Sequence, residues 1–86
     1  MPTTQITNTS SRIGEIVRRF FAERIFAQKL EFHLGDLHKY VSRRLGGKVA
    51  PGSPDRVMRM LRKQGMLNYE VLSRASSKYL AMGVTL

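Results

Sequence analysis

The sequence predicts a single α+β domain. Three stretches repeat apolar residues at the three- and four-residue spacing of a helix, and three shorter stretches alternate apolar and polar residues as strands do. The chain has 86 residues, which is enough for one modest hydrophobic core. We expect a polar N-terminal tail over residues 1–10 and one folded domain over residues 11–86.

The first predicted helix covers residues 11–28. Either Ser10 or Ser11 suits its N-cap, because a serine hydroxyl can accept a hydrogen bond from a free N–H of the first turn. The apolar side chains recur on one broad face, which we expect to form a wall of the core. They are Ile13, Ile16, Val17, Phe20, Phe21, Ile25 and Phe26.

A short strand and a second helix are predicted next. Over residues 29–34 apolar and polar side chains alternate, which favours a strand, and a helix running on through this stretch is the alternative. Residues 35–47 return to helical spacing, with Asp36 near the start, where the helix dipole favours an anion. Gly46 and Gly47 end this helix, since glycine readily adopts the left-handed conformation of a helix C-terminus.

The third predicted helix covers residues 54–64. Ser53 suits the N-cap, and Pro54 suits the first helical position, where its missing N–H costs nothing. At about 100° per residue, the helix separates a basic side from an apolar one. The predicted buried face contains Val57, Met60 and Leu61, with Met58 at its flank.

The last third of the chain changes from helical to strand spacing. Residues 66–72 place Leu67, Tyr69 and Val71 at every second position, and residues 78–84 alternate in the same way. The small polar stretch between these runs predicts the turn of a β-hairpin.

Positive charge is concentrated in the second half of the chain. Residues 1–38 contain five basic and four acidic side chains, whereas residues 39–86 contain ten basic and two acidic ones. This distribution favours a polyanionic partner, and nucleic acid more than a membrane surface.

The order of helix, short strand, helix, helix and hairpin resembles that of a winged helix-turn-helix domain over residues 11–84. The segment APGSPDRVMRMLRKQGMLNYEVLSRASSKYLA is similar to the terminal half of small winged-helix proteins of bacteria and their phages. The resemblance implies a three-helix core with a short strand and a C-terminal hairpin, the wing. The connection before the third helix is longer than in a simple helix-turn-helix, which leaves the angle between those helices open.

The stretch SPDRVMRMLRKQG carries three Arg, one Lys and a single acid, Asp55. Like charges three residues apart repel by a few tenths of a kcal/mol, so we interpret the crowding as an adaptation to a phosphate-lined groove. A recognition helix in the DNA major groove fits, because Arg pairs with guanine through two hydrogen bonds. A solvated helix face is the alternative. We expect Arg56, Arg59 and Arg62 near bases and Lys63 on phosphate.

Other polar side chains are expected to support this contact. In winged-helix proteins the wing lies on the DNA backbone or reaches the minor groove, which implies such a role for the hairpin turn. The expected supporting residues are Ser53, Arg74, Ser76 and Lys78, with Lys39, Arg43, Arg44 and Lys48 extending the phosphate track. The arginines of the first helix alternate with glutamates and are interpreted as a solvated face.

These observations predict a duplex-DNA-binding protein, a transcriptional regulator of bacterial or phage type, in the cytoplasm. One recognition helix reads few base pairs, so a homodimer is expected, with the apolar face of the first helix as its contact. The alternative is a winged-helix module that binds an acidic surface of another protein. RNA is a weaker option, because no aromatic stacking platform is evident.

The residue pattern does not favour an enzyme, a cofactor or a metal. His33 and His38 are five residues apart, which misses the spacing of a helical metal site, and the six acidic residues are scattered. No glycine-rich phosphate loop is present, and no apolar run approaches the ~20 residues of a membrane span. We therefore expect no catalytic residues, no cofactor, no metal and no membrane insertion.

Overall fold

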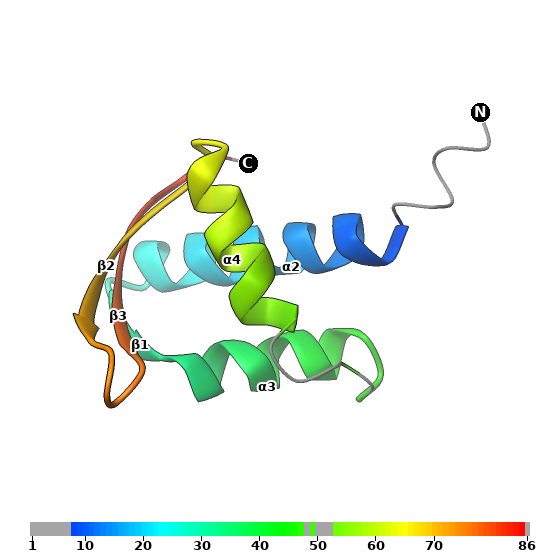
Figure 1. The fold of residues 1–86 in the computed structure, drawn as a ribbon, viewed down its shortest axis with the longest axis horizontal. Helices are drawn as coiled ribbons and strands as arrows, with labels where there is room; N and C mark the ends of the chain where they lie inside the picture. Colours follow the sequence, from blue (N-terminus) through cyan, green and yellow to red (C-terminus); the bar gives the residue numbers. More distant parts are fainter. Residues whose placement is uncertain (1–7, 48, 50–52, 86) are drawn as a thin grey trace.

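Three helices pack around a core that a small antiparallel sheet closes on one side (Figure 1). The structure is a computed structural model, which describes residues 8–47, 49 and 53–85. Within these residues the chain forms an α+β domain, as its sequence predicts. The elements are α2 (Asn8–Phe26), β1 (Glu31–His33), α3 (Leu34–Arg44), α4 (Ser53–Lys63), β2 (Leu67–Ser73) and β3 (Lys78–Val84).

Helix α2 begins earlier than its sequence predicts. Its first residue is Asn8, so Ser10 and Ser11 lie inside the helix and neither is its N-cap. The predicted tail therefore overlaps α2 over residues 8–10, while residues 1–7 lie outside the described part of the chain.

Arg24 fixes the path of the chain after α2. Its Nε donates to the carbonyl of Lys29 at 3.0 Å, and its Nη2 donates to the carbonyl of Glu31 at 2.7 Å. Gln28 has a left-handed backbone (φ 60°), which turns the chain out of the helix two residues after Phe26. The guanidinium of Arg24 thus satisfies carbonyls of the connection to β1, a role that its interpretation as part of a solvated face did not include.

The start of α3 depends on His33, which ends β1 and serves as the N-cap. The N–H of Gly35 donates to Nδ1 of His33 at 2.9 Å, and the N–H of His33 donates to Oδ2 of Asp36 at 3.1 Å. This reciprocal arrangement is a capping box. It places the helix start at Leu34, one residue before the predicted position, and shortens the predicted strand.

Helix α4 buries a different face from the predicted one. Val57 and Leu61 are buried as expected, but the third large apolar contact comes from Met58, while Met60 is 41% exposed. Pro54 is also buried, and together these residues define a face whose centre lies more than 90° around the helix from Met60. The prediction of Met60 as a core residue is therefore wrong.

The sheet has the strand order β1-β3-β2, with both pairs antiparallel. The hairpin of β2 and β3 turns over residues 74–77, where Ser77 has a left-handed backbone (φ 55°). The carbonyl of Ser77 accepts a hydrogen bond from the N–H of Leu34 at 2.9 Å. The hairpin turn is thus held against the first residue of α3.

The core lies between the three helices and the inner face of the sheet. Phe26, which the sequence places on the apolar face of α2, is 92% exposed, so that face ends before it. Each fully buried large apolar side chain contributes about 1.5–3 kcal/mol. The buried set comprises Ile13, Val17, Phe20, Phe21, Phe32, Leu37, Val41, Val57, Met58, Leu61, Leu67, Tyr69 and Ala81.

Gly14 offers a test of the contact between α2 and α4. A Cβ added there would lie 3.9 Å from Val57 and 4.0 Å from Leu61, which is ordinary van der Waals contact. Gly14→Ala should therefore raise the free energy of unfolding by about 0.5–1 kcal/mol, because it removes backbone freedom from the unfolded chain. Urea or thermal unfolding followed by circular dichroism measures this change.

Gly65 is the matched control for Gly14. It ends α4 with a left-handed backbone (φ 79°) that disfavours a side chain. Gly65→Ala should lower the free energy of unfolding by about 1–2 kcal/mol. An equal loss in both variants would contradict the packing of α2 on α4 described above.

Candidate nucleic-acid interface

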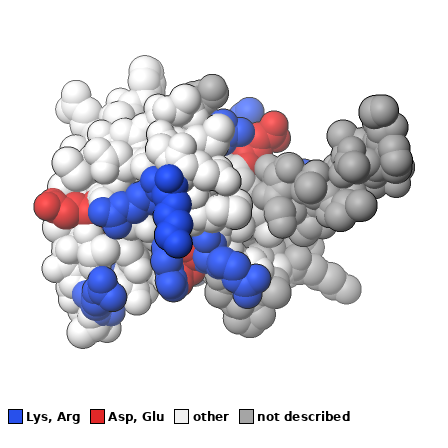
Figure 2. All heavy atoms as spheres, turned by 45° about the horizontal axis from the view of Figure 1, so that its top comes forward, with Lys and Arg blue, Asp and Glu red and all other residues white. Residues whose placement is uncertain are grey.

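The four basic side chains of α4 are all exposed to solvent. Figure 2 shows Lys and Arg side chains gathered on one face of the molecule, with a smaller number of acidic side chains beside them. Among the described residues, neither Arg56 nor Lys63 has an ion-pair partner. The other two cations, Arg59 and Arg62, each contact a side chain of the same chain.

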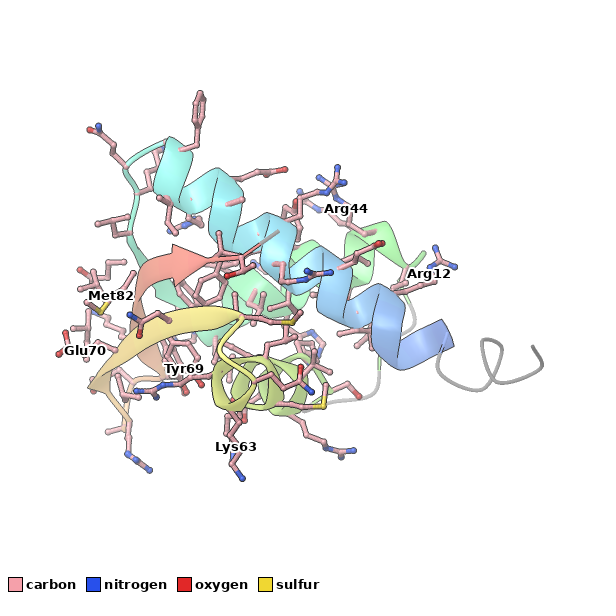
Figure 3. All side chains as sticks on the ribbon, turned by 90° about the horizontal axis from the view of Figure 1, so that it is seen from above. Arg12, Arg44, Lys63, Tyr69, Glu70 and Met82 are labelled. Carbon is pink, nitrogen blue, oxygen red and sulfur yellow. The ribbon has the colours of Figure 1, made fainter. Side chains whose placement is uncertain are left out.

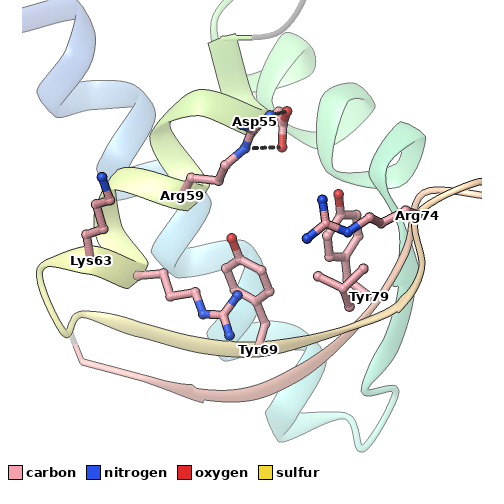
Figure 4. Close-up of a pocket in the computed structure, with 8 residues that line it drawn as sticks. Asp55, Arg59, Lys63, Tyr69, Arg74 and Tyr79 are labelled. Carbon is pink, nitrogen blue, oxygen red and sulfur yellow. Dashed lines mark hydrogen bonds and ion pairs between the residues drawn. The ribbon is translucent and has the colours of Figure 1, made fainter.

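Arg59 is paired with Asp55 one turn earlier on α4. Nη2 of Arg59 donates to Oδ2 of Asp55 in a close ion pair (Figure 4). The carboxylate is the more buried partner, since its side chain is 19% exposed against 70% for Arg59. The interpretation of the crowded charge as an adaptation to a phosphate-lined groove does not account for this internal partner of Arg59.

Arg62 lies over the ring of Tyr69. Its guanidinium carbon is 4.6 Å from the ring centroid, which is a cation–π contact between α4 and β2. The negative face of the ring attracts the guanidinium and holds it against β2. Contacts within the molecule thus offset part of the repulsion that Arg59 and Arg62 experience from the other cations of α4. No external anion is needed for this.

A cleft of about 420 Å³ separates α4 from the sheet (Figure 4). Both sides contribute cations, since Arg74 comes from the hairpin turn and the other three from α4. We call this space the α4–sheet cleft. Its lining residues are Asp55, Arg59, Arg62, Lys63, Tyr69, Val71, Arg74 and Tyr79.

The two tyrosines of the α4–sheet cleft are fixed by the aromatic core. The ring of Tyr79 stacks on Phe32 of β1 with centroids 5.7 Å apart, and it meets Tyr69 edge-on at the same distance. Tyr69 in turn contacts Phe21 of α2 at 6.0 Å. Figure 4 shows the hydroxyl of Tyr69 pointing into the space between α4 and the sheet. These rings therefore present phenol groups from a rigid base.

The hairpin turn carries the remaining predicted wing residues. Arg74 and Ser76 are exposed, and the N–H of Ser76 donates to Oγ of Ser73 at 3.2 Å, which closes the turn. Lys78 begins β3, where it pairs in register with His33 and Ser73. Of the predicted wing residues, Arg74 reaches the cleft.

The cations of α3 do not line the α4–sheet cleft. Arg44 lies 3.6 Å from Glu23 of α2 and 4.6 Å above the ring of Tyr40, and Figure 3 shows it on the side of the molecule away from Lys63. Lys39 and Arg43 are exposed on the same helix, beside Tyr40 in a separate hollow. The prediction that they continue the phosphate track of α4 finds no support in this arrangement.

Two predicted site residues lie at the edge of what the structure describes. Ser53 is the first described residue of α4 and is half-buried. Lys48 lies outside the described residues.

Sequence reasoning missed Asp55, Tyr69 and Tyr79 as site residues. A signal for the tyrosines was present, because Tyr69 and Tyr79 fall on the inward-facing positions of β2 and β3. Their position beside α4 depends on how this helix packs against the sheet. The alternation of apolar and polar residues in the strands does not specify that packing. Asp55 is the sole acid of α4, and its i, i+4 spacing to Arg59 is the sequence signal that predicts their pairing.

Comparison of the chain with protein-family models, with curated proteins and with solved structures found no match. No described helix combines the length and the apolar character that crossing a lipid bilayer demands. In the described part of the chain, no three His, Asp or Glu side chains gather in a way that could hold a metal ion.

The tyrosines predict how stability depends on alkaline pH. Burial raises the pKa of Tyr69 above its ordinary value of 10.0, and the Arg62 guanidinium opposes this more weakly. Burial, followed by the hydrogen bond to Glu23, raises the pKa of Tyr40. The folded protein thus holds these protons more tightly than the unfolded chain, so their stabilisation is complete below about pH 10 and is lost as the pH rises through the folded-state pKa.

Urea unfolding across this alkaline range measures the decline. The Tyr69→Phe protein lacks one of the two groups and should lose less stability over the same interval. A decline of the same size in Tyr69→Phe would show that the burial of this phenol has no part in it.

Proposed function

We propose that this protein is a winged-helix domain that binds duplex DNA, with α4 in the major groove and the turn after β2 on the backbone. The order of elements and the sheet order β1-β3-β2 are compatible with that fold and support the proposal. The observation that carries the function is that Arg56 and Lys63 of α4 are exposed and have no ion-pair partner in the described part of the chain.

The major groove of DNA is wide enough to admit an α-helix, whose outward side chains then reach the base edges. The outward side of α4 presents Arg56 and Lys63, with Met60 between them. Arg56 suits two-pronged pairing with a guanine edge, and Lys63 suits a phosphate as a point charge. Arg59 joins them if it leaves Asp55, and Arg62 is oriented by Tyr69 toward the cleft rather than toward bases.

A role as a transcriptional regulator of bacterial or phage type, in the cytoplasm, completes the proposal. A homodimer would extend the short site that one helix can read. The apolar face of α2 does not serve as the contact, because Val17, Phe20 and Phe21 are packed inside the monomer. An acidic protein surface is the alternative partner, and the exposed Met60 beside the cations is the observation that favours it.

The combined Arg56→Ala, Lys63→Ala protein tests the proposal. Fluorescence anisotropy with a random-sequence duplex should give an affinity at least about tenfold lower than that of the parent. The slope of log affinity against log salt, near −5 if about six phosphates are neutralised, should become shallower by about one unit for each lost phosphate contact.

The combined Arg12→Ala, Arg19→Ala protein is the charge-matched control. Both arginines are exposed on α2, and Figure 3 shows Arg12 far from Lys63. Its affinity should stay within about twofold of the parent. If both double variants lose affinity equally, net charge explains binding and α4 has no special role. If the parent binds no duplex even at low salt, the acidic protein partner becomes the better candidate.

A further inference from the structure

We propose that the α4–sheet cleft is a phosphate-binding site, and that Asp55 holds Arg59 there in place of the phosphate until a ligand arrives. The inference rests on the proposed function, which makes the phosphate one of the DNA backbone. It goes further by assigning roles to Tyr69, Tyr79 and Asp55, which are not needed for a helix in the major groove.

The charges of the cleft favour an anion. Four cations and one carboxylate line it, which leaves a formal excess of three positive charges. The cations approach from opposite sides, because Arg74 belongs to the hairpin turn while Arg59, Arg62 and Lys63 belong to α4. A tetrahedral phosphate can accept hydrogen bonds from several directions at once, which a planar carboxylate cannot do equally well.

The phenol groups add neutral donors at fixed positions. Tyr69 and Tyr79 are anchored through their rings to Phe21 and Phe32, so little side-chain freedom is lost when their hydroxyls donate. Figure 4 shows Tyr79 beside Arg74, and Tyr69 farther along the sheet toward Lys63. The site thus combines charged and neutral donors, as phosphate sites in proteins commonly do.

Arg62 is prepared for this role by its contact with Tyr69. The guanidinium carbon lies 4.6 Å from the ring centroid, and this contact holds the cation beside the cleft that both residues line. A lysine at this position would lack both the stacking and the planar set of donors.

Asp55 is the feature that makes the site switchable. Its carboxylate repels a phosphate and occupies Arg59 in the free protein. Arg59 is the more exposed member of the pair, with a side chain that is 70% accessible to solvent. It can therefore turn from Asp55 to an incoming anion. Arg59 can exchange the Asp55 carboxylate for a phosphate without losing an anionic partner. Phosphate binding is therefore coupled to the breaking of the Asp55–Arg59 ion pair.

The test is a titration with inorganic phosphate followed by ¹⁵N–¹H NMR, with chloride added to the reference sample to equal ionic strength. Signals of Tyr69, Arg74 and Tyr79 should shift. Asp55→Asn should tighten phosphate binding by about two- to fivefold, Arg74→Ala should weaken it about tenfold, and Tyr79→Phe about threefold. Arg12→Ala, on α2 and outside the lining of the cleft, should leave it unchanged.

The same variants also define the result that would overturn the phosphate site. If Arg74→Ala and Tyr79→Phe bind phosphate as the parent does, or if α2 signals shift as much as those of the cleft, the site does not exist. Because Asp55 lies in the first turn of α4, each variant is first compared with the parent by its NMR spectrum. Tyr79→Phe, which keeps the ring, remains informative if Asp55→Asn alters the fold.

A duplex competition identifies the source of the phosphate. Duplex DNA should displace inorganic phosphate, and one neutral methylphosphonate substitution in the duplex should lower the affinity of the parent but not of Arg74→Ala. A duplex that binds without displacing phosphate overturns this inference and leaves DNA binding by α4 intact. Phosphate binding with no duplex binding at all overturns the proposed function and identifies free phosphate as the ligand.

Discussion

The packing of aromatic rings between α2 and the sheet is the interaction on which the rest of the molecule depends. Phe21 of α2 and Phe32 of β1 contact each other at 5.3 Å, and each meets one of the two tyrosines of the hairpin. The rings therefore join three segments that are distant in the sequence. Because aromatic contacts have preferred edge-on and stacked geometries, they fix the position of the hairpin, and with it the spacing between the sheet and α4. A change in this packing would alter the basic surface without touching a basic residue.

The order and type of the elements follow from the sequence, and their ends do not. The spacing of apolar residues along the chain predicts every helix and strand, because that spacing determines which side chains share one face of an element. The ends depend on side chains that meet after folding. His33 ends a strand and begins a helix because its ring accepts a hydrogen bond from Gly35 while Asp36 accepts one from the His33 backbone.

The prediction that Met60 lies in the core is wrong for a related reason. Apolar character alone does not reveal which of two methionines on α4 faces the core, and in the folded protein it is Met58 that is buried.

The charge distribution was visible in the sequence, but its internal balance was not. Crowded arginines on one helix repel, and that repulsion calls for some compensating contact. The structure supplies part of it from within, through the carboxylate of Asp55 and the ring of Tyr69. This division separates the cations of α4 into two kinds. Arg59 and Arg62 each contact a partner in the same chain, whereas Arg56 and Lys63 are exposed and have no ion-pair partner among the described residues. A helix with a uniform basic face is therefore the wrong picture of α4, and a partner that contacts it would meet two surfaces with different geometry.

The placement of the tyrosines has a practical consequence. The chain contains three tyrosines and no tryptophan, so its near-ultraviolet emission comes from tyrosine alone. Two of these three fluorophores border the space between α4 and the sheet, one of them beneath a guanidinium. Any event in that space changes the surroundings of most of the emitting groups at once. The unlabelled molecule therefore carries its own optical reporter in the α4–sheet cleft.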